Sequence, residues 1–222
     1  MSTLTDPALL RLLQLSSAAL PVGGYAFSQG LESAVAECWV DDAAATREWL
    51  CAQLHESVAR IDLPLLERQM RAMAIGDTRA LDEWNAYLLA ARETAELRLT
   101  ETAMGAALRR LLRQLDVSVP ELDEPGFVSV FAVAAVHWCV PPRSACLGYA
   151  WSWLENQVTA ATKLVPLGQS QAQILLGELI GQMPAALDRA GATADEDIGA
   201  SLPGLALAST WHEVQYTRLF RS

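Results

Sequence analysis

Two short segments of the chain resemble catalytic motifs, and the first surrounds Ser28. The run Ala26-Phe27-Ser28-Gln29-Gly30 differs from the GxSxG nucleophile elbow at its first position. A nucleophile elbow requires a strand before the serine, with a histidine and an acid supplied later. The preceding segment, Pro21-Val22-Gly23-Gly24-Tyr25, is instead typical of a turn. We therefore expect Ser28 to be the N-cap of a helix that starts at Gln29, and not a nucleophile.

The second segment, residues 212–216, begins like the zinc-protease motif HExxH. The second zinc ligand of that motif must lie one helical turn after the first, and this position holds Tyr216. The spacing therefore excludes a zinc-protease site of this type.

A soft-metal site or a nucleotide site also finds little support. His137, Cys139 and Cys146 could together bind a soft metal, but Pro141-Pro142 interrupts the segment, so no single helix brings the two thiols together. We expect buried thiols beside a core histidine instead. The chain has no GxxxxGK[ST] loop, and Gly23-Gly24 does not open a dinucleotide-binding unit, because no parallel-sheet pattern surrounds it.

The composition favours helices and argues against nucleic acid as a partner. The 222 residues are 52% hydrophobic and rich in Leu and Ala, with few β-branched runs. The formal net charge is −10 and no basic run is present, whereas phosphate binding rests on clustered Lys and Arg. The negative charge suits either a basic protein partner or solubility alone.

Helical spacing continues along almost the whole chain. One apolar stripe consists of Leu50, Leu54, Val58 and Ile61, and Asp41 and Asp42 before it are candidate N-caps. Further helices are predicted by the apolar run from Phe127 to Val140, and by a long pattern that follows Pro141-Pro142 and stops at Pro166. These patterns predict an all-α fold, with residues 1–222 forming a single compact domain of roughly nine or ten helices. The stretch 190–197 is the one predicted mobile loop.

The chain start and the cysteines indicate a cytoplasmic protein. Residues 1–6 lack the basic and apolar regions of a signal peptide. The apolar run that begins at Phe127 is too short to cross a bilayer and contains His137. The four cysteines form no CxxC pair, as expected for free thiols in a reducing compartment. We therefore expect neither a membrane nor an extracellular location.

Three segments are not explained by core packing alone. Residues 20–32 are rich in Gly and aromatics, residues 163–171 combine a helix end with a polar restart, and residues 216–222 place two Arg and two aromatics at the C-terminus. Tyr, Phe and Arg are the residue types that anchor protein interfaces. The tail either docks the last helix onto the core or binds a partner protein.

These segments also carry a resemblance to a known family. LPVGGYAFSQGLE at 20–32, ARETAELRLTE at 91–101, KLVPLGQ at 163–169 and HEVQYTRLFRS at 212–222 resemble the UreF family of urease accessory proteins. The resemblance extends from end to end, and residues 117–145 match only loosely. It implies an all-α accessory protein without established catalytic activity.

The resemblance also implies partners. UreF proteins bind the accessory protein UreD, called UreH in some organisms, and recruit the GTPase UreG. The complex acts on apo-urease, into which two nickel ions are inserted. No cofactor is expected for this chain, since nickel and GTP would be handled by the complex. A homodimer is also expected as a possible state.

Carried over by position, the resemblance assigns a partner-binding role to thirteen residues. The tail at about 212–222 would dock on UreD, and the turn near Gly23 would belong to the surface that receives UreG. Arg92 and Arg98 correspond to family arginines, but salt bridges on helix faces explain them equally well. The thirteen candidates are Pro21, Gly23, Gly24, Tyr25, Ser28, Glu32, Lys163, Gln169, His212, Glu213, Tyr216, Arg218 and Arg221.

Two functions of other classes compete with the adaptor hypothesis. A nickel-binding metallochaperone is suggested by His212, His137 and the four cysteines, although no His-rich tract or ligand cluster at helical spacing is present. A small hydrolase would use Ser28. The adaptor hypothesis further predicts that a chain lacking residues 212–222 stays folded but no longer binds UreD.

Overall fold

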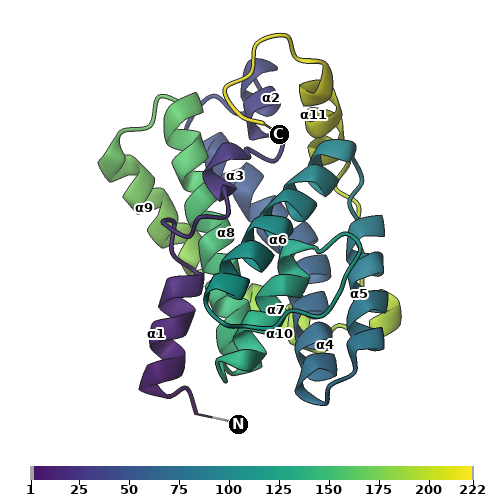
Figure 1. Ribbon diagram of the computed structural model, residues 1–222. Coiled ribbons are helices and arrows are strands. Elements are labelled where there is room, and N and C mark those ends of the chain that lie inside the picture. The colour runs from purple at the N-terminus through teal and green to yellow at the C-terminus, as the bar shows by residue number, and fades with distance from the viewer. Residues whose placement is uncertain (1–2, 222) are drawn as a thin grey trace.

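The protein is built from helices joined by short loops, as the computed structural model of residues 3–221 shows (Figure 1). Residues 3–221 contain no strand. The α-helices are α1 (Asp6–Leu15), α2 (Leu31–Ala36), α3 (Ala43–Gln53), α4 (Leu63–Ala74), α5 (Thr78–Ala90), α6 (Ala95–Gln114), α7 (Phe127–His137), α8 (Pro142–Leu164), α9 (Gln169–Ile180), α10 (Met183–Ala192) and α11 (Pro203–Val214). The prediction of an all-α fold is confirmed.

A π-helical segment, η2 (Leu54–Asp62), joins α3 to α4 without a break. Counting α3, η2 and α4 as one rod, the eleven α-helices of the described chain become ten, in agreement with the expected number. Leu50, Leu54, Val58 and Ile61 are all buried, as the apolar spacing predicts. The expectation of a regular α-helix through this stretch is wrong, because apolar residues about four apart also lie on one face of the wider π-helix.

Helix α7 lies at the centre of the molecule. Every residue from Phe127 to Ala135 is buried, and α4 and α6 pack against it (Figure 1). The apolar run that predicted a buried helix is therefore confirmed. The long α8 and the rod of α3 and α4 extend the same continuous apolar core.

Local sequence signals set several helix ends. The Asp42 carboxylate accepts a hydrogen bond from the Ala45 amide at 2.8 Å, so it is the N-cap of α3. Helix α8 begins at Pro142 and ends at Leu164, two residues before Pro166, as predicted.

The predicted mobile loop at 190–197 is held in place. The Arg68 guanidinium donates to the Asp195 carboxylate at 2.8 Å and to the Thr193 carbonyl. The first residues of the stretch belong to α10, and Asp195–Asp197 forms the 3-10 helix η3. The small, acidic composition of this segment could not reveal a partner more than a hundred residues away.

The expectation of buried thiols beside a core histidine is wrong for two of the three side chains. His137 and Cys139 are exposed at the turn between α7 and α8, where Cys139 adopts a left-handed φ of 55°. Cys146 is buried in α8, and burial raises the pKa of its thiol. The turn points Cys139 outward and so separates it from Cys146.

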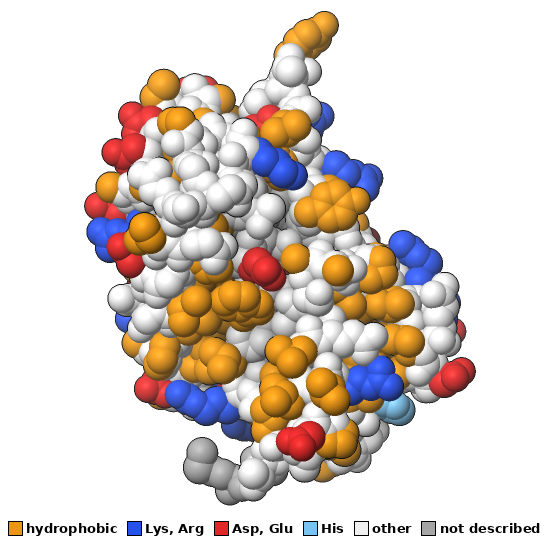
Figure 2. Space-filling view, turned by 90° about the vertical axis from the view of Figure 1, so that its left-hand side faces the viewer, with side chains coloured by type: hydrophobic (Ala, Val, Ile, Leu, Met, Phe, Trp, Pro, Cys, Tyr) orange, Lys and Arg blue, Asp and Glu red, His pale blue; other side chains and the backbone are white. Residues whose placement is uncertain are grey.

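Apolar side chains also gather on one face of the surface, over α1 and its neighbours (Figure 2). We call this the α1 face and define it by Leu9, Leu10 and Leu13 of α1, Leu147 of α8 and Ile174 of α9, all of which are exposed. A hollow of about 630 Å³ lies between α1 and the end of α7, and another of about 450 Å³ lies between the start of α8 and α10. None of the described helices is both long and apolar enough to span a bilayer.

Candidate partner-binding site

The C-terminal tail folds back from α11 and ends between α11 and α2 (Figure 1). The Glu32 carboxylate on α2 holds it there. One carboxylate oxygen accepts a hydrogen bond from the Leu219 amide at 2.6 Å, and the other accepts one from the Phe220 amide at 2.8 Å. Glu32 is only 7% exposed, so these charge-assisted bonds lie away from water. A buried carboxylate on one helix thus fixes the backbone of a segment 187 and 188 residues away.

His212 on α11 connects this carboxylate to a second one. Its Nε2 lies 3.1 Å from Glu32 Oε2 and its Nδ1 lies 2.8 Å from Glu96 Oε2, while its side chain is fully buried. Each of the two nitrogen–oxygen contacts needs one proton between its atoms. The imidazole therefore carries both protons, or one of the carboxyl groups carries one of them. In both cases His212 ties α2, α6 and α11 together.

Glu96 is shared between the histidine and the tail. Its Oε1 accepts a hydrogen bond from Arg218 at 2.9 Å. Burial raises the pKa of Glu96 above its usual range, against the opposing effect of His212 and Arg218. With an imidazolium and two carboxylates, Arg218 brings the net charge of the four groups to zero. The cluster is thus a neutral, hydrogen-bonded anchor for the tail.

The tail has an inward side and an outward side. Phe220 is buried, and its ring lies 5.4 Å from the Lys163 ammonium at the end of α8. Tyr216 is fully exposed and Leu219 is 63% exposed. The docking alternative therefore holds for Phe220, whereas Tyr216 and Leu219 face solvent and partner binding stays a prediction.

The glycine-rich turn lies directly beside the tail. The Arg221 amide donates to the Ala26 carbonyl at 2.8 Å, and the Arg221 guanidinium lies over the Phe27 ring at 6.0 Å. Gly23 adopts a left-handed φ of 78°, which a residue with a side chain rarely adopts, and the following turn leaves Tyr25 exposed. The first, third and fourth sequence motifs therefore meet on one surface.

Ser28 does not start a helix at Gln29 as predicted. Helix α2 begins at Leu31, and its N-cap is Gly30, with a φ of 81°. The Ser28 hydroxyl still accepts a hydrogen bond from the Glu32 amide at 3.3 Å, so it caps the helix from farther back. A side chain at position 30 would press against Leu205 and the Ser209 amide of α11, which explains the glycine at this close approach.

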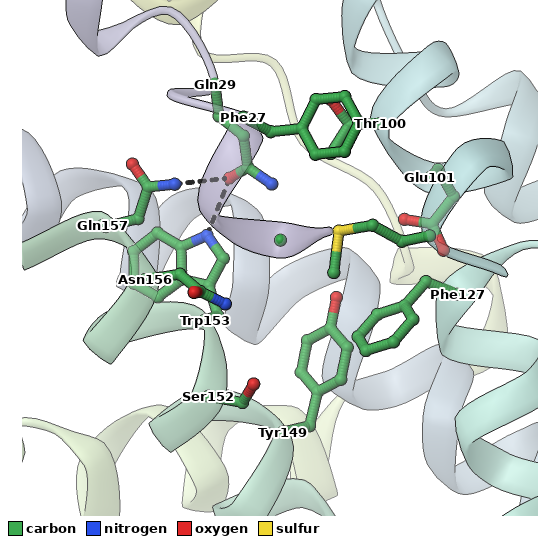
Figure 3. A pocket seen from close by; sticks show the side chains of 12 residues that line it. Phe27, Gln29, Thr100, Glu101, Phe127, Tyr149, Ser152, Trp153, Asn156 and Gln157 are labelled. Carbon is green, nitrogen blue, oxygen red and sulfur yellow. Dashed lines mark hydrogen bonds between the residues drawn. The ribbon is translucent and has the colours of Figure 1, made fainter. Parts of the chain in front are cut away.

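A small cavity with a mixed polar and apolar lining lies beneath the turn (Figure 3). Gln29 reaches into it and accepts hydrogen bonds from Trp153 at 2.9 Å and Gln157 at 3.4 Å (Figure 3). Its volume of about 30 Å³ is room for roughly two water molecules and excludes a nucleotide or an organic substrate.

Most of the predicted site residues are exposed. Pro21, Tyr25, Lys163, Gln169, Glu213, Tyr216, Arg218 and Arg221 face solvent, and Gly23 is half-buried. Gly24, Ser28, Glu32 and His212 are buried. Binding of a partner stays a prediction for all thirteen, and the buried residues can contribute to it only by positioning the exposed ones. Gln169, at the start of α9, forms no hydrogen bond or ion pair with residues 216–221.

Sequence reasoning missed the role of Glu96 and of a second buried cluster. Glu96 lies in the stretch 91–101, where only arginines had been singled out. Arg92 is buried and pairs with Asp62 at 2.8 Å and with Glu101 at 2.6 Å, so it is not on a helix surface. Burial disfavours its charged form, but the two carboxylates outweigh this effect and raise the pKa of Arg92. Arg98 of α6 pairs at the surface with Glu124 in the loop before α7, so its salt bridge joins a helix to a loop and does not lie along one helix face.

No group of three or more His, Cys, Asp or Glu side chains within residues 3–221 is arranged to hold a metal ion. The cluster of Glu32, His212 and Glu96 contains suitable residue types, but its two carboxylates bind opposite nitrogens of the same imidazole ring. Their oxygens and one ring nitrogen therefore do not converge on a point.

Comparison with known proteins identifies relatives over the full chain. The family model for UreF matches residues 40–180. A urease accessory protein UreF from Marinomonas sp. strain MWYL1 is 54% identical over 220 residues, covering 98% of this chain and 96% of the relative. A protein of the same name from Chromohalobacter salexigens is 52% identical over 221 residues, with the same coverage. One from Pseudomonas putida is 48% identical over 225 residues, covering 98% and 99%.

Proposed function

Because the chain belongs to the UreF family of urease accessory proteins, we propose that it acts in urease maturation as a non-enzymatic adaptor. In this proposal it binds UreD (UreH) through its tail and recruits the GTPase UreG beside the turn. The assembled complex then supports or gates GTP-dependent nickel insertion into apo-urease.

One observation carries this proposal: three segments far apart in the sequence form one continuous exposed surface. We call it the tail–turn surface and define it by Tyr25, Lys163, Tyr216, Leu219 and Arg221. Its side chains are exposed, while the backbone beneath them is fixed by Glu32 and by the hydrogen bond from Arg221 to Ala26. Exposed Tyr and Arg on a rigid backbone form the type of surface that anchors protein interfaces at a low entropic cost.

Two features of the turn agree with an adaptor. Ser28 is fully buried, and its hydroxyl accepts a hydrogen bond from a backbone amide. The cavity beneath the turn holds no more than about two water molecules. These features support binding over catalysis.

The experiment is a binding assay between immobilised UreD from the same organism and the purified chain. The double variant Tyr216→Ala/Leu219→Ala changes only exposed side chains, so the Phe220 anchor remains. We expect it to weaken UreD binding at least about tenfold. The matched control is Ile75→Ala, an exposed apolar residue at the end of α4. Equal affinity of wild type and double variant would contradict the role of the tail.

The GTPase part of the proposal rests on Arg221. Its side chain is exposed and forms no ion pair with the described residues, whereas Arg218 is paired with Glu96. An arginine supplied in trans stabilises the transition state of phosphoryl transfer in some GTPases. If Arg221 acts in this way, UreG hydrolysis should be faster with the wild-type chain and UreD than with Arg221→Ala. If the chain instead lowers the rate of GTP hydrolysis by UreG, it would gate the GTPase and not activate it.

We place the possible homodimer on the α1 face. Leu10 and Leu13 are 66% and 59% exposed, and apolar side chains gather over α1 and its neighbours (Figure 2). Burying such a surface against a second copy would remove apolar area from water on both chains.

A further inference from the structure

Helix α11 is apolar on two opposite faces. Leu205, Ala208 and His212 face the core, as expected for a helix packed on a domain. Leu207, Trp211 and Val214 recur at intervals of four and three and are exposed. A surface helix normally carries polar residues on its outer face. The described chain therefore leaves most of the outer row of α11 uncovered.

A second tryptophan extends this row. Trp39, just after α2, lies edge-on against Trp211 with a ring-centroid distance of 5.0 Å. The residue before it, Cys38, has a left-handed φ of 58°, a conformation that residues other than glycine rarely adopt. This turn places Trp39 on the surface, where it remains 41% exposed. We call the four side chains Leu207, Trp211, Val214 and Trp39 the α11 stripe.

Three carboxylates lie close to the stripe in the sequence. Glu37 and Asp41 flank Trp39 in the sequence, and Glu213 lies on α11 between Trp211 and Val214. All three are exposed, and none forms an ion pair with residues 3–221. An apolar centre with an acidic rim is complementary to an apolar segment flanked by Lys or Arg.

The stripe is continuous with the tail. Helix α11 ends at Val214, and the fully exposed Tyr216 follows two residues later. A partner that contacts Tyr216 and Leu219 therefore has the stripe directly beside it. Tryptophan is among the residue types most enriched at the energetic centre of protein interfaces.

We propose that the α11 stripe is the energetic centre of the interface with the partner that binds the tail. That partner covers Trp39 and Trp211 with an apolar segment and places Lys or Arg side chains against Glu37, Asp41 and Glu213. The inference rests on the proposed function, since it takes the tail-binding partner, UreD in that proposal, as the occupant.

The test measures the affinity of the purified chain for UreD, with variants of the stripe. Trp211→Ala and Trp39→Ala should each weaken binding roughly 30-fold, the effect expected of an interface hot spot. The control Ile75→Ala should leave the affinity unchanged. Far-ultraviolet circular dichroism and thermal melting confirm that each variant is folded.

Charge reversal tests the acidic rim separately. Glu37→Lys combined with Glu213→Lys should slow association at low salt about tenfold and weaken its salt dependence. The matched control is Glu196→Lys combined with Asp197→Lys in η3, which reverses two exposed carboxylates outside the stripe. An equal effect of both changes would show that only the net charge matters and would overturn the assignment of the rim.

Hydrogen exchange of the wild-type chain needs no variant. The amides of residues 207–214 should gain protection when UreD is added. A different pattern separates the two proposals: UreD binds the wild type, Tyr216→Ala/Leu219→Ala weakens binding, and both tryptophan variants bind like the wild type. In that case the stripe is not part of the interface, and the proposed function stands. If UreD does not bind the wild type at all, both proposals are wrong.

Discussion

The substitution Glu32→Gln should release the tail while leaving the rest of the fold intact. Glutamine keeps one acceptor oxygen and replaces the other by an NH₂ donor, which cannot accept from an amide. At least one of the bonds from Leu219 at 2.6 Å or Phe220 at 2.8 Å is therefore lost. A hydrogen bond to a charged group contributes about 1.5–3 kcal/mol, and a buried donor without a partner adds a desolvation penalty. We expect a total loss of about 2–4 kcal/mol.

The loss should appear first as local opening, because the tail is at the end of the chain. A change of 2–4 kcal/mol corresponds to amide exchange at Leu219 and Phe220 that is about 30-fold to several hundred-fold faster. If the whole fold lost 2–4 kcal/mol, the melting temperature would fall by at least about 4 °C, at 2–4 °C per kcal/mol. A local loss confined to the tail should therefore lower the melting temperature by less than about 4 °C.

Hydrogen exchange followed by mass spectrometry or NMR measures both amides. The matched control is Glu37→Gln at the C-terminal end of α2, an exposed carboxylate that accepts no hydrogen bond from the tail. Unchanged protection of Leu219 and Phe220 in Glu32→Gln would refute the role of Glu32 as the anchor.

Three further predictions concern other parts of the molecule. Burial raises the pKa of the Asp62 carboxyl above its usual value near 3.8, so Asp62 contributes stability at low pH that is lost as the pH rises through the folded pKa. Asparagine does not titrate, so the free energy of unfolding of Asp62→Asn minus that of the wild type should increase with pH in urea titrations. A difference that stays constant with pH would contradict this prediction. Phe220→Ala removes the buried apolar anchor of the tail without altering an exposed side chain. It should weaken UreD binding about tenfold or more, because the tail must then be ordered when UreD binds. Unchanged affinity would argue against preorganisation of the tail for binding. Light scattering should give twice 24.0 kDa for the wild type and 24.0 kDa for Leu10→Asp/Leu13→Asp, whereas equal masses would remove the α1 face as the dimer interface.

The structure changes the expectation for a chain that lacks residues 212–222. That deletion removes His212, Arg218 and Phe220 together, so Glu32 and Glu96 would lose every partner that the tail provides. Unpaired buried carboxylates are strongly unfavourable. The truncated chain should therefore be destabilised, which makes substitutions of exposed tail residues the cleaner test of binding.

Helix positions could be predicted where the signal is local. Asp42 as a cap, Pro142 at the start of α8 and the apolar run from Phe127 each act through neighbouring residues, and all three predictions are confirmed. The π-helix at Leu54–Asp62 could not be predicted in this way, because the same apolar spacing fits an α-helix.

The candidate site was predictable only as a set of segments. Their resemblance to a family identified the turn, Lys163 and the tail, but not how they meet. The contacts between Glu32 and Phe220, and between His212 and Glu96, join residues more than a hundred positions apart. No periodicity encodes such a pairing, since it depends on how α2, α6 and α11 pack. For the same reason, His212 was assigned to partner contact although it is fully buried.

The most direct test of the adaptor function is whether UreG reaches UreD only through this chain. Tagged UreD is co-expressed with UreG in cells that lack the chain, contain the wild type, or contain Tyr216→Ala/Leu219→Ala, and the proteins bound to UreD are quantified. An adaptor predicts that UreG co-purifies with the wild type and is lost both without the chain and with the double variant. Equal recovery of UreG without the chain would contradict the account.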